Sequence, residues 1–243
     1  MAKITEAPFL SVITICYNNA DGLKKTFDSI RKIKTSDIEY IVIDGASTDS
    51  TPEILKQNKD IIDILVSEKD DGIYNAINKG IKLAHGSLIG LIHAGDFYLP
   101  NAFSGLKALH ESFPDSILYG ALKAIKNDDF DSIWGFNSKN LSEKMIPHPA
   151  CFVPACIYEK FGTYNESFKI AADYECFLRF YKAGVSFVFT DTIVCGFNLD
   201  GVSQKKTEQT EKEVEAIKKM HGVYKEPCKK AKLKKVLKKI IRF

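Results

Sequence analysis

Carboxylates follow three apolar runs in the first hundred residues of the chain. Asp44 ends one run, Glu68 and Asp70 lie just past the next, and Asp96 lies just past a third. The runs are short and rich in β-branched residues, which is typical of strands buried on both faces of a parallel sheet. Because ligands of such sheets bind beyond the carboxyl ends of the strands, we expect these carboxylates to converge on one edge.

A group of converging carboxylates needs a cation, because like charges close together repel one another. A hard divalent ion, Mg²⁺ or Mn²⁺, with oxygen ligands and a bridge to a substrate's phosphates would resolve the repulsion. The alternative is that each acid caps a turn or the following helix. We expect this simpler role for Asp21 and Asp49, and a functional role for Asp44 and Asp96 because of their positions at strand ends.

The spacing of apolar residues predicts strands that alternate with helices up to residue 100. We expect strands over 9–17, 39–43, 61–66 and 87–92, and helices over 22–33, after Ser50 as a hydroxyl N-cap, and from Ile73 to Ala84. This alternation favours the α/β class, with a doubly wound, mostly parallel sheet and helices on both faces. The chain has no G-x-G-x-x-G and no G-x-x-x-x-G-K-[ST] pattern, which excludes the usual dinucleotide and P-loop phosphate sites.

The second half of the chain is less regular and predicts a smaller, mixed arrangement that closes a pocket over the first half. We expect helices over 101–111 and 172–182, strands over 116–125, 130–136, 185–190 and 193–197, and an extended, proline-rich segment MIPHPACFVP.

Five motifs resemble those of glycosyltransferase family 2, in the same order and at the same spacing. They are SVITICYNN, YIVIDGASTDST, SEKDDGIYNAINKGI, LIHAGDFYLP and AADYECFLRF. The resemblance covers roughly residues 8–204. It implies the GT-A fold, a nucleotide-activated sugar as donor, and one glycosyltransferase domain over 1–204. In that domain a nucleotide-sugar-binding half spans about 8–100 and an acceptor-side half spans 101–204.

The first three motifs of the family frame the donor site. The resemblance maps contacts with the nucleotide's base to Ile15, Tyr17 and Asp44, and the rest of the frame to Glu68, Asp70 and Gly72. Uridine is the expected base by family habit alone.

The fourth motif of the family usually holds an acidic pair whose last aspartate ligates a metal under the diphosphate. That aspartate maps to Asp96, whereas His93 and Gly95 stand where further acids are common. The resemblance therefore implies one carboxylate ligand for Mn²⁺ or Mg²⁺. His93 is a second ligand, a donor to phosphate or a structural histidine.

The fifth motif implies that Asp173 is the catalytic base, although Ala172 replaces the glutamate that usually precedes it. An acceptor hydroxyl is a poor nucleophile until a base removes its proton. One base and one metal-held leaving group imply a single in-line displacement, which inverts the anomeric carbon. His148 is either an acceptor or diphosphate contact or a structural residue. Trp134 is either a platform for the acceptor sugar or part of the core.

Composition excludes several other classes of protein. Hydrophobic residues make up 45% and charged residues 27% of the chain, enough for a large core and against disorder throughout. No apolar run approaches the roughly 18–20 residues of a membrane span, and the N-terminus has no signal-peptide pattern. The six cysteines form no C-x-x-C pair, which favours reduced thiols in the cytoplasm over a zinc site. The Gln-x-x-Arg-Trp motif of processive family members is absent, which implies the addition of a single sugar.

Charge is distributed unevenly between the body of the chain and its tail. Residues 1–204 carry 20 basic and 26 acidic side chains, and residues 205–243 carry 14 basic and 5 acidic ones. The last fifteen residues, KKAKLKKVLKKIIRF, combine eight basic side chains with an apolar stripe at helical spacing. We expect an amphipathic helix that docks on an anionic membrane surface through residues 225–243. A solvated or packing helix is the alternative, and nucleic acid is disfavoured because it would leave the stripe unburied.

These observations lead to one main hypothesis. It is an inverting glycosyltransferase that moves one sugar from a nucleotide sugar, expected to be a UDP-sugar, to a hydroxyl of a lipid-linked glycan. It would work in polysaccharide biosynthesis, in the cytoplasm and peripherally at the inner face of the cell membrane. The alternative is a catalytically inactive nucleotide-sugar-binding or scaffolding protein of the same fold. A nucleotidyltransferase is disfavoured because no lysine- and arginine-rich glycine loop follows the first strand.

Overall fold

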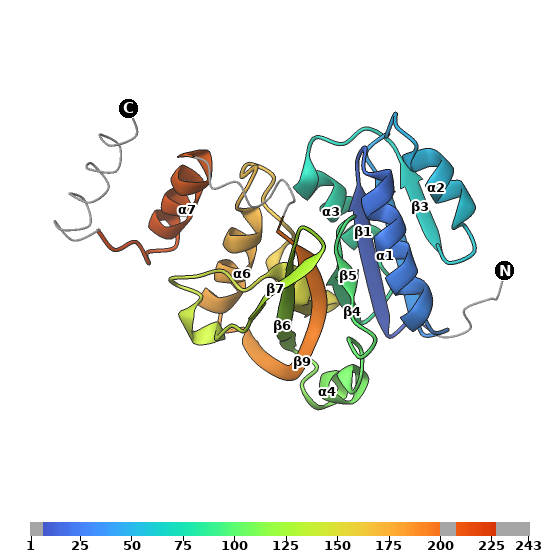
Figure 1. Cartoon of the computed structure of the whole chain (residues 1–243). Helices are drawn as coiled ribbons and strands as arrows, with labels where there is room; N and C mark the ends of the chain where they lie inside the picture. Colours follow the sequence, from blue (N-terminus) through green and yellow to red (C-terminus); the bar gives the residue numbers. More distant parts are fainter. Residues whose placement is uncertain (1–6, 200–207, 227–243) are drawn as a thin grey trace.

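A computed structural model describes residues 7–199 and 208–226 (Figure 1). Nine strands of these residues form one sheet in the order β3-β2-β1-β4-β8-β6-β9-β5, with β7 paired to β6. The strands are β1 (Leu10–Cys16), β2 (Ile38–Asp44), β3 (Ile64–Ser67), β4 (Leu88–Leu91), β5 (Phe97–Tyr98), β6 (Ser116–Lys126), β7 (Asp129–Trp134), β8 (Cys151–Pro154) and β9 (Ser186–Asn198). The helices are α1 (Ala20–Ile33), α2 (Thr51–Gln57), α3 (Ile73–Leu83), α4 (Leu106–Ser112), α5 (Ala155–Phe161), α6 (Ala172–Lys182) and α7 (Glu208–Met220), with 3₁₀ turns η1 (Ser138–Asn140) and η2 (His148–Ala150).

The first four strands are parallel, as their apolar runs predict. β1 pairs with β2 and with β4, and β2 pairs with β3, all in the parallel sense. In this register Cys16 lies opposite Asp44, and Asp44 lies opposite Ser67. The carboxyl ends of three strands therefore meet at one level, which places the loops after them side by side.

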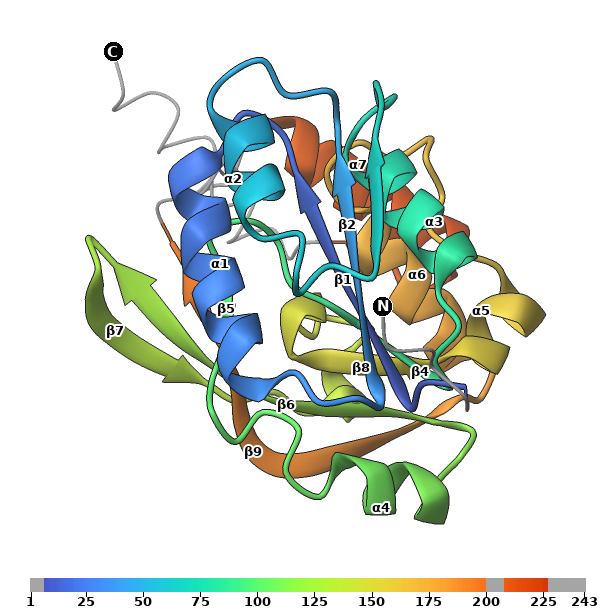
Figure 2. The same ribbon diagram turned by 90° about the vertical axis from the view of Figure 1, so that its right-hand side faces the viewer.

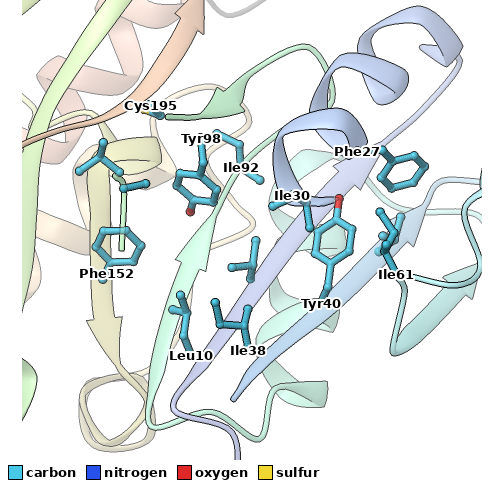
Figure 3. Packing of buried hydrophobic residues seen from close by; sticks show 14 of the residues in the cluster. Leu10, Phe27, Ile30, Ile38, Tyr40, Ile61, Ile92, Tyr98, Phe152 and Cys195 are labelled. Atoms are coloured by element: carbon cyan, nitrogen blue, oxygen red, sulfur yellow. The ribbon is translucent and has the colours of Figure 1, made fainter. Parts of the chain in front are cut away.

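Helices cover both faces of the sheet, which confirms the α/β prediction (Figure 2). Side chains alternate across a strand, so β1 sends Leu10 and Val12 to one face and Ile13 to the other. On the first face they pack with α1 and α2, where Phe27 and Ile30 of α1 lie beside the strand residues (Figure 3). On the second face Ile13 packs with residues of α3, α5 and α6.

The second half extends the same sheet with mixed strand directions. β8 runs antiparallel to both β4 and β6, and β9 runs parallel to β6. The two strands predicted over 185–190 and 193–197 are one bent strand, β9, whose register against β6 shifts near Asp191, a residue with φ of 52°. The sequence pattern broke there because an irregular pairing interrupts the alternation of side chains.

Helix boundaries in the second half differ most from the prediction. The helix predicted over 101–111 is shorter and shifted, because α4 covers only 106–112. The helix α5 was not predicted, because its seven residues are too few to display a helical period. In the first half, Ser50 precedes α2 without a side-chain capping bond. The N–H of Thr51 instead donates to the Asp49 carboxylate at 2.9 Å, the capping role expected for Asp49.

α7 packs against α6 at the end of the described chain (Figure 1). Ile217 of α7 is fully buried in a small cluster with Ala171, Tyr174 and Leu178. Residues 208–226 therefore belong to the packed body. Most of the segment 225–243, for which membrane docking is expected, lies outside the described residues.

Candidate active site

Asp44 lies at the end of β2 and has no exposed area. Its carboxylate accepts hydrogen bonds from the backbone N–H of Ser47 at 3.2 Å, from the Ser47 hydroxyl and, at 2.6 Å, from the Ser67 hydroxyl. These bonds supply the donors that a buried carboxylate needs and fix the loop after β2. The Asp44 carboxylate is therefore engaged by its own loop and by the end of β3.

The exposed ring of Tyr17 and the partly buried carboxylate of Asp70 both lie close to the buried backbone of Gly45, the residue after Asp44. The Tyr17 side chain is 64% exposed just past β1. A Cβ atom placed on Gly45 would lie 3.2 Å from Cδ2 of Tyr17 and 3.1 Å from a carboxylate oxygen of Asp70. A side chain at Gly45 would therefore crowd both the Tyr17 ring and the Asp70 carboxylate. Ile15 is half-buried near the end of β1, on the same face of the sheet as Ile13.

Lys79 of α3 supplies the cation for two of the converging carboxylates. Its Nζ atom lies 2.7 Å from Oε1 of Glu68 and 2.6 Å from Oδ1 of Asp70. Hydrogen bonds to Asp70 and then Glu68 raise the pKa of Lys79. The repulsion that suggested a divalent ion is therefore relieved here by an amine. Sequence reasoning missed Lys79, although a lysine two turns into the following helix was a visible signal.

Gly72 begins the helix that carries Lys79. Its φ is 123°, in the region where a side chain is strained, and nothing lies within 4 Å of a Cβ placed there. Backbone conformation rather than lack of space requires glycine at this turn. The turn fixes the distance between the acidic loop 68–71 and α3.

Thr26 of α1 holds the loop between β4 and β5. Its hydroxyl donates to the carbonyl oxygen of Asp96 at 2.7 Å and accepts from the N–H of Gly95 at 3.1 Å. Gly95 has φ of 109°, so the conformation of this loop disfavours a second acid at that position. Thr26 is fully buried within the apolar stripe of α1. That polar residue on a buried stripe was the signal from which its role could have been predicted.

Asp96 is 6% exposed, and its Oδ1 atom accepts a hydrogen bond of 2.8 Å from the N–H of Asn198 at the end of β9. Burial raises the pKa of Asp96 to about 7, while the Asn198 bond and the nearby side chains of His148 and Lys25 act in the opposite direction. The carboxyl group therefore changes its charge near neutral pH. The loop after β4 and the end of β9 meet at this residue.

Two histidines connect the Asp96 loop to Asp173. The Nε2 atoms of His93 and His148 are 2.8 Å apart, and Nδ1 of His148 lies 3.3 Å from Oδ2 of Asp173. With both rings neutral, His148 donates from Nδ1 to Asp173 and accepts at Nε2 from His93. Burial and the facing His148 lower the pKa of His93 to about 3. Nδ1 of His93 is shielded from solvent and has no partner within the described residues.

Asp173 lies in the first turn of α6 and is held on its other side by Tyr74 of α3. The Tyr74 hydroxyl donates to the carbonyl oxygen of Ile170 at 2.7 Å and lies 3.3 Å from Oδ1 of Asp173. The N–H of Tyr174 donates to the same Oδ1 at 2.8 Å. Both carboxylate oxygens therefore have fixed neighbours, while the side chain stays 23% exposed and open to a substrate.

Trp134 packs rather than projecting into this network. It is half-buried on β7, its ring lies 6.3 Å from that of Phe197, and its Nε1 donates to the hydroxyl of Ser132. Of the two roles considered from the sequence, core packing is the one that these contacts support.

A divalent cation can be tested against the donors present. Within residues 7–199 and 208–226, no group of three or more His, Cys, Asp or Glu side chains is arranged to hold a metal ion. Asp96 offers one carboxylate with a single protein donor on it. One carboxylate is only part of a ligand set for Mg²⁺ or Mn²⁺, and a substrate's phosphates and water would have to supply the rest.

The family model described as glycosyl transferase family 2 matches residues 11–171. The chain belongs to glycosyltransferase family 2. A relative described as an uncharacterized glycosyltransferase of Mycobacterium tuberculosis is 32% identical over 196 residues, which cover 72% of this chain and 70% of that protein. A PGL/p-HBAD biosynthesis glycosyltransferase of Mycobacterium bovis is 29% identical over 181 residues, 71% of this chain and 70% of the relative.

Solved glycosyltransferases share the fold of this family 2 chain. The S. aureus TarS 1–349 structure in complex with UDP-GlcNAc aligns with a TM-score of 0.72 and 15% identity, covering 87% of this chain and 66% of TarS. The mannosyltransferase PcManGT of Pyrobaculum calidifontis, in complex with GDP-Man and Mn²⁺, aligns with a TM-score of 0.60 and 19% identity, covering 80% and 58%. The architecture is thus the GT-A fold, and the protein is a glycosyltransferase.

No helix in the described part of the chain has the length and apolar character needed to cross a membrane.

Proposed function

We propose that this family 2 glycosyltransferase inverts the anomeric carbon as it moves one sugar from a UDP-sugar to a hydroxyl of a glycan acceptor. The observation that carries the proposal is the chain of contacts from His93 through His148 to Asp173. It connects the loop that follows β4, in the half assigned to the donor, with a partly exposed carboxylate in the half assigned to the acceptor.

In this mechanism Asp173 takes the proton of the acceptor hydroxyl while the hydroxyl oxygen attacks the anomeric carbon. The bond between that carbon and the diphosphate breaks on the opposite face, and the nucleoside diphosphate leaves with the bonding electrons. His148 at Oδ2 and the N–H of Tyr174 at Oδ1 hold the two carboxylate oxygens of Asp173, so that the base is oriented before the acceptor arrives.

On the donor side, we assign the nucleobase to the surface of Tyr17, Gly45 and Asp70, with Asp44 fixing the loop beneath it. The exposed ring of Tyr17 suits stacking on a flat base, and the TarS complexes with UDP and UDP-GlcNAc support uridine. Mn²⁺ or Mg²⁺, when bound at Asp96, would neutralise charge on the diphosphate. The mannosyltransferase complex with Mn²⁺ supports this choice of cofactor.

The acceptor and location form the second part of the proposal. A PGL/p-HBAD biosynthesis relative supports a glycolipid or lipid-linked glycan as acceptor. The basic composition of residues 225–243 supports docking on the inner face of the cell membrane. Within the chain, the proposal assigns the nucleotide sugar to residues 8–100 and the acceptor to residues 101–204. The basic segment 205–243 follows, and its helix α7 packs on α6.

Two measurements test this function. A thermal-shift screen of nucleotide sugars, with and without Mn²⁺, should single out the donor, because a ligand that binds the folded state raises its stability. With that donor, Asp173→Asn should lower turnover about 10²- to 10⁴-fold and leave nucleotide affinity unchanged. Normal transfer by Asp173→Asn would show that Asp173 is not the base.

A further inference from the structure

α6 begins without a capping side chain of its own. The residue before its first turn is Ala171, which has no oxygen to accept from the free N–H groups of the helix start. The three residues that lead into the helix, 169–171, also point their N–H groups in one direction. These N–H groups need an acceptor from outside α6, because the segment is partly buried. The segment ends two residues before Asp173.

The acceptor is the carboxylate of Glu213, which belongs to α7. Its Oε1 accepts from the N–H of Lys169 at 3.1 Å. Its Oε2 accepts from the N–H of Ile170 at 2.9 Å and of Ala171 at 3.0 Å. Three successive amides thus converge on one anion, an arrangement that favours negative charge strongly.

The same short segment is held from its other side by Tyr74. The Tyr74 hydroxyl donates to the carbonyl oxygen of Ile170, while the N–H of Ile170 donates to Glu213. The backbone of Ile170 is therefore held at both its N–H and its carbonyl oxygen. Tyr74 also contacts Asp173, so any shift of this peptide changes the geometry at the carboxylate.

Packing keeps Glu213 in position. Ile217, one helical turn further along α7, is fully buried against Ala171 and Tyr174. Two turns along, Nε2 of His221 lies 3.2 Å from Oε1 of Glu175, a buried carboxylate of α6. Burial raises the pKa of Glu213, but hydrogen bonds from the backbone of 169–171 outweigh it and lower the pKa overall. The group is charged at neutral pH.

We infer that Glu213 is a positioning residue for transfer, which fixes Asp173 by capping the segment that enters α6. The role rests on the proposed function of Asp173. Through Glu213, α7 supports the position of Asp173, although no atom of α7 needs to contact a substrate.

The test compares Glu213→Ala and Glu213→Gln with wild type, using UDP release from the donor found in the screen. The expected result is a kcat about 10- to 100-fold lower in Glu213→Ala, with the KM for the donor and UDP affinity within about twofold. Glu213→Gln keeps one acceptor oxygen and the packing volume, so its loss should be smaller. Hydrogen exchange of the amides of residues 169–171 should become faster in both variants.

Glu215→Gln on the same helix is the matched control, because Glu215 is exposed and pairs with Lys219 of its own helix. It should keep the wild-type kcat. A wild-type kcat in Glu213→Ala, with Asp173→Asn inactive, overturns the inference and leaves the proposed function standing. Full activity of Asp173→Asn overturns both. Equal losses of kcat and UDP affinity in Glu213→Gln also overturn the inference, because they indicate general disruption of the fold.

Discussion

The Nδ1 atom of His148 lies 3.3 Å from Oδ2 of Asp173. The same ring meets His93, so a single imidazole bridges the loop after β4 and the first turn of α6. These two elements are far apart in the sequence and belong to the two halves of the sheet. The bridge is a direct physical connection between the group proposed as base and the loop proposed to hold the diphosphate.

Replacing His148 with alanine should lower kcat more than it changes donor affinity. The variant leaves Oδ2 of Asp173 without its neighbour and leaves Nε2 of His93 unpaired. We expect a loss of about tenfold or more in kcat, since general-base catalysis depends on orientation. Steady-state kinetics of UDP release would measure it. His110→Ala on α4 is the control, and equal kinetics in the two variants would contradict the role of His148.

The stability of the metal-free protein should fall as pH rises from about 4 to 7, through the titration of Asp96. Its pKa is about 7 in the folded state and about 3.9 when unfolded, so only the folded state binds the proton in this window. Ionisation above pH 7 then costs the folded state about 4 kcal/mol, at 1.36 kcal/mol per pKa unit.

Asp96→Asn should remove this contribution to the pH dependence while keeping an oxygen for the N–H of Asn198. Urea unfolding in EDTA at pH 4 and pH 8 would measure the difference. The variant should be more stable than wild type at pH 8 and similar to it at pH 4. Parallel stability profiles for the two proteins would rule out a raised pKa at Asp96.

Thr26→Val should destabilise the fold by about 1–3 kcal/mol. Valine has nearly the same shape as threonine but lacks the hydroxyl, so the partly buried N–H of Gly95 loses its acceptor. Thr26→Ser keeps the hydroxyl and should recover most of the loss. Equilibrium urea unfolding gives both free energies. If valine and serine variants unfold alike, the hydroxyl does not hold the loop 93–96.

Truncation after Glu226 should weaken binding to vesicles that contain anionic lipid and leave UDP release from the donor intact. The cut keeps the ion pair between Lys225 and Glu143, so the described body is unchanged. Sedimentation with vesicles of phosphatidylcholine, with and without phosphatidylserine, would measure binding. The electrostatic part should weaken with salt. Equal binding of full-length and truncated protein would refute membrane docking by the tail.

The parallel part of the sheet could be predicted from sequence because β1 and β4 are continuous apolar runs and the helices α1 and α3 each have one apolar stripe. Such patterns depend only on neighbouring residues in the sequence, so they can be recognised without knowledge of tertiary contacts. The bent strand β9 escaped prediction because Asp191 interrupts its alternation. The short helix α5 escaped because seven residues do not complete two turns.

The groups around the site could be predicted less well, because they are fixed by tertiary contacts. Lys79 neutralises Glu68 and Asp70 only once α3 folds back on the acidic loop. Asp96 receives the N–H of Asn198, a backbone group with no sequence signature. The acidic motif could be located from sequence, but the charge at that motif depends on partners from distant segments.

The hydrogen bonds that Glu213 of α7 accepts from the segment before α6 have a practical consequence for engineering this enzyme. The stretch from Glu208 to Met220 has the composition of a polar linker helix. Replacement of everything after residue 204 with a tag or a fluorescent protein would remove Glu213 with it. Fusion junctions should therefore be placed after Glu226.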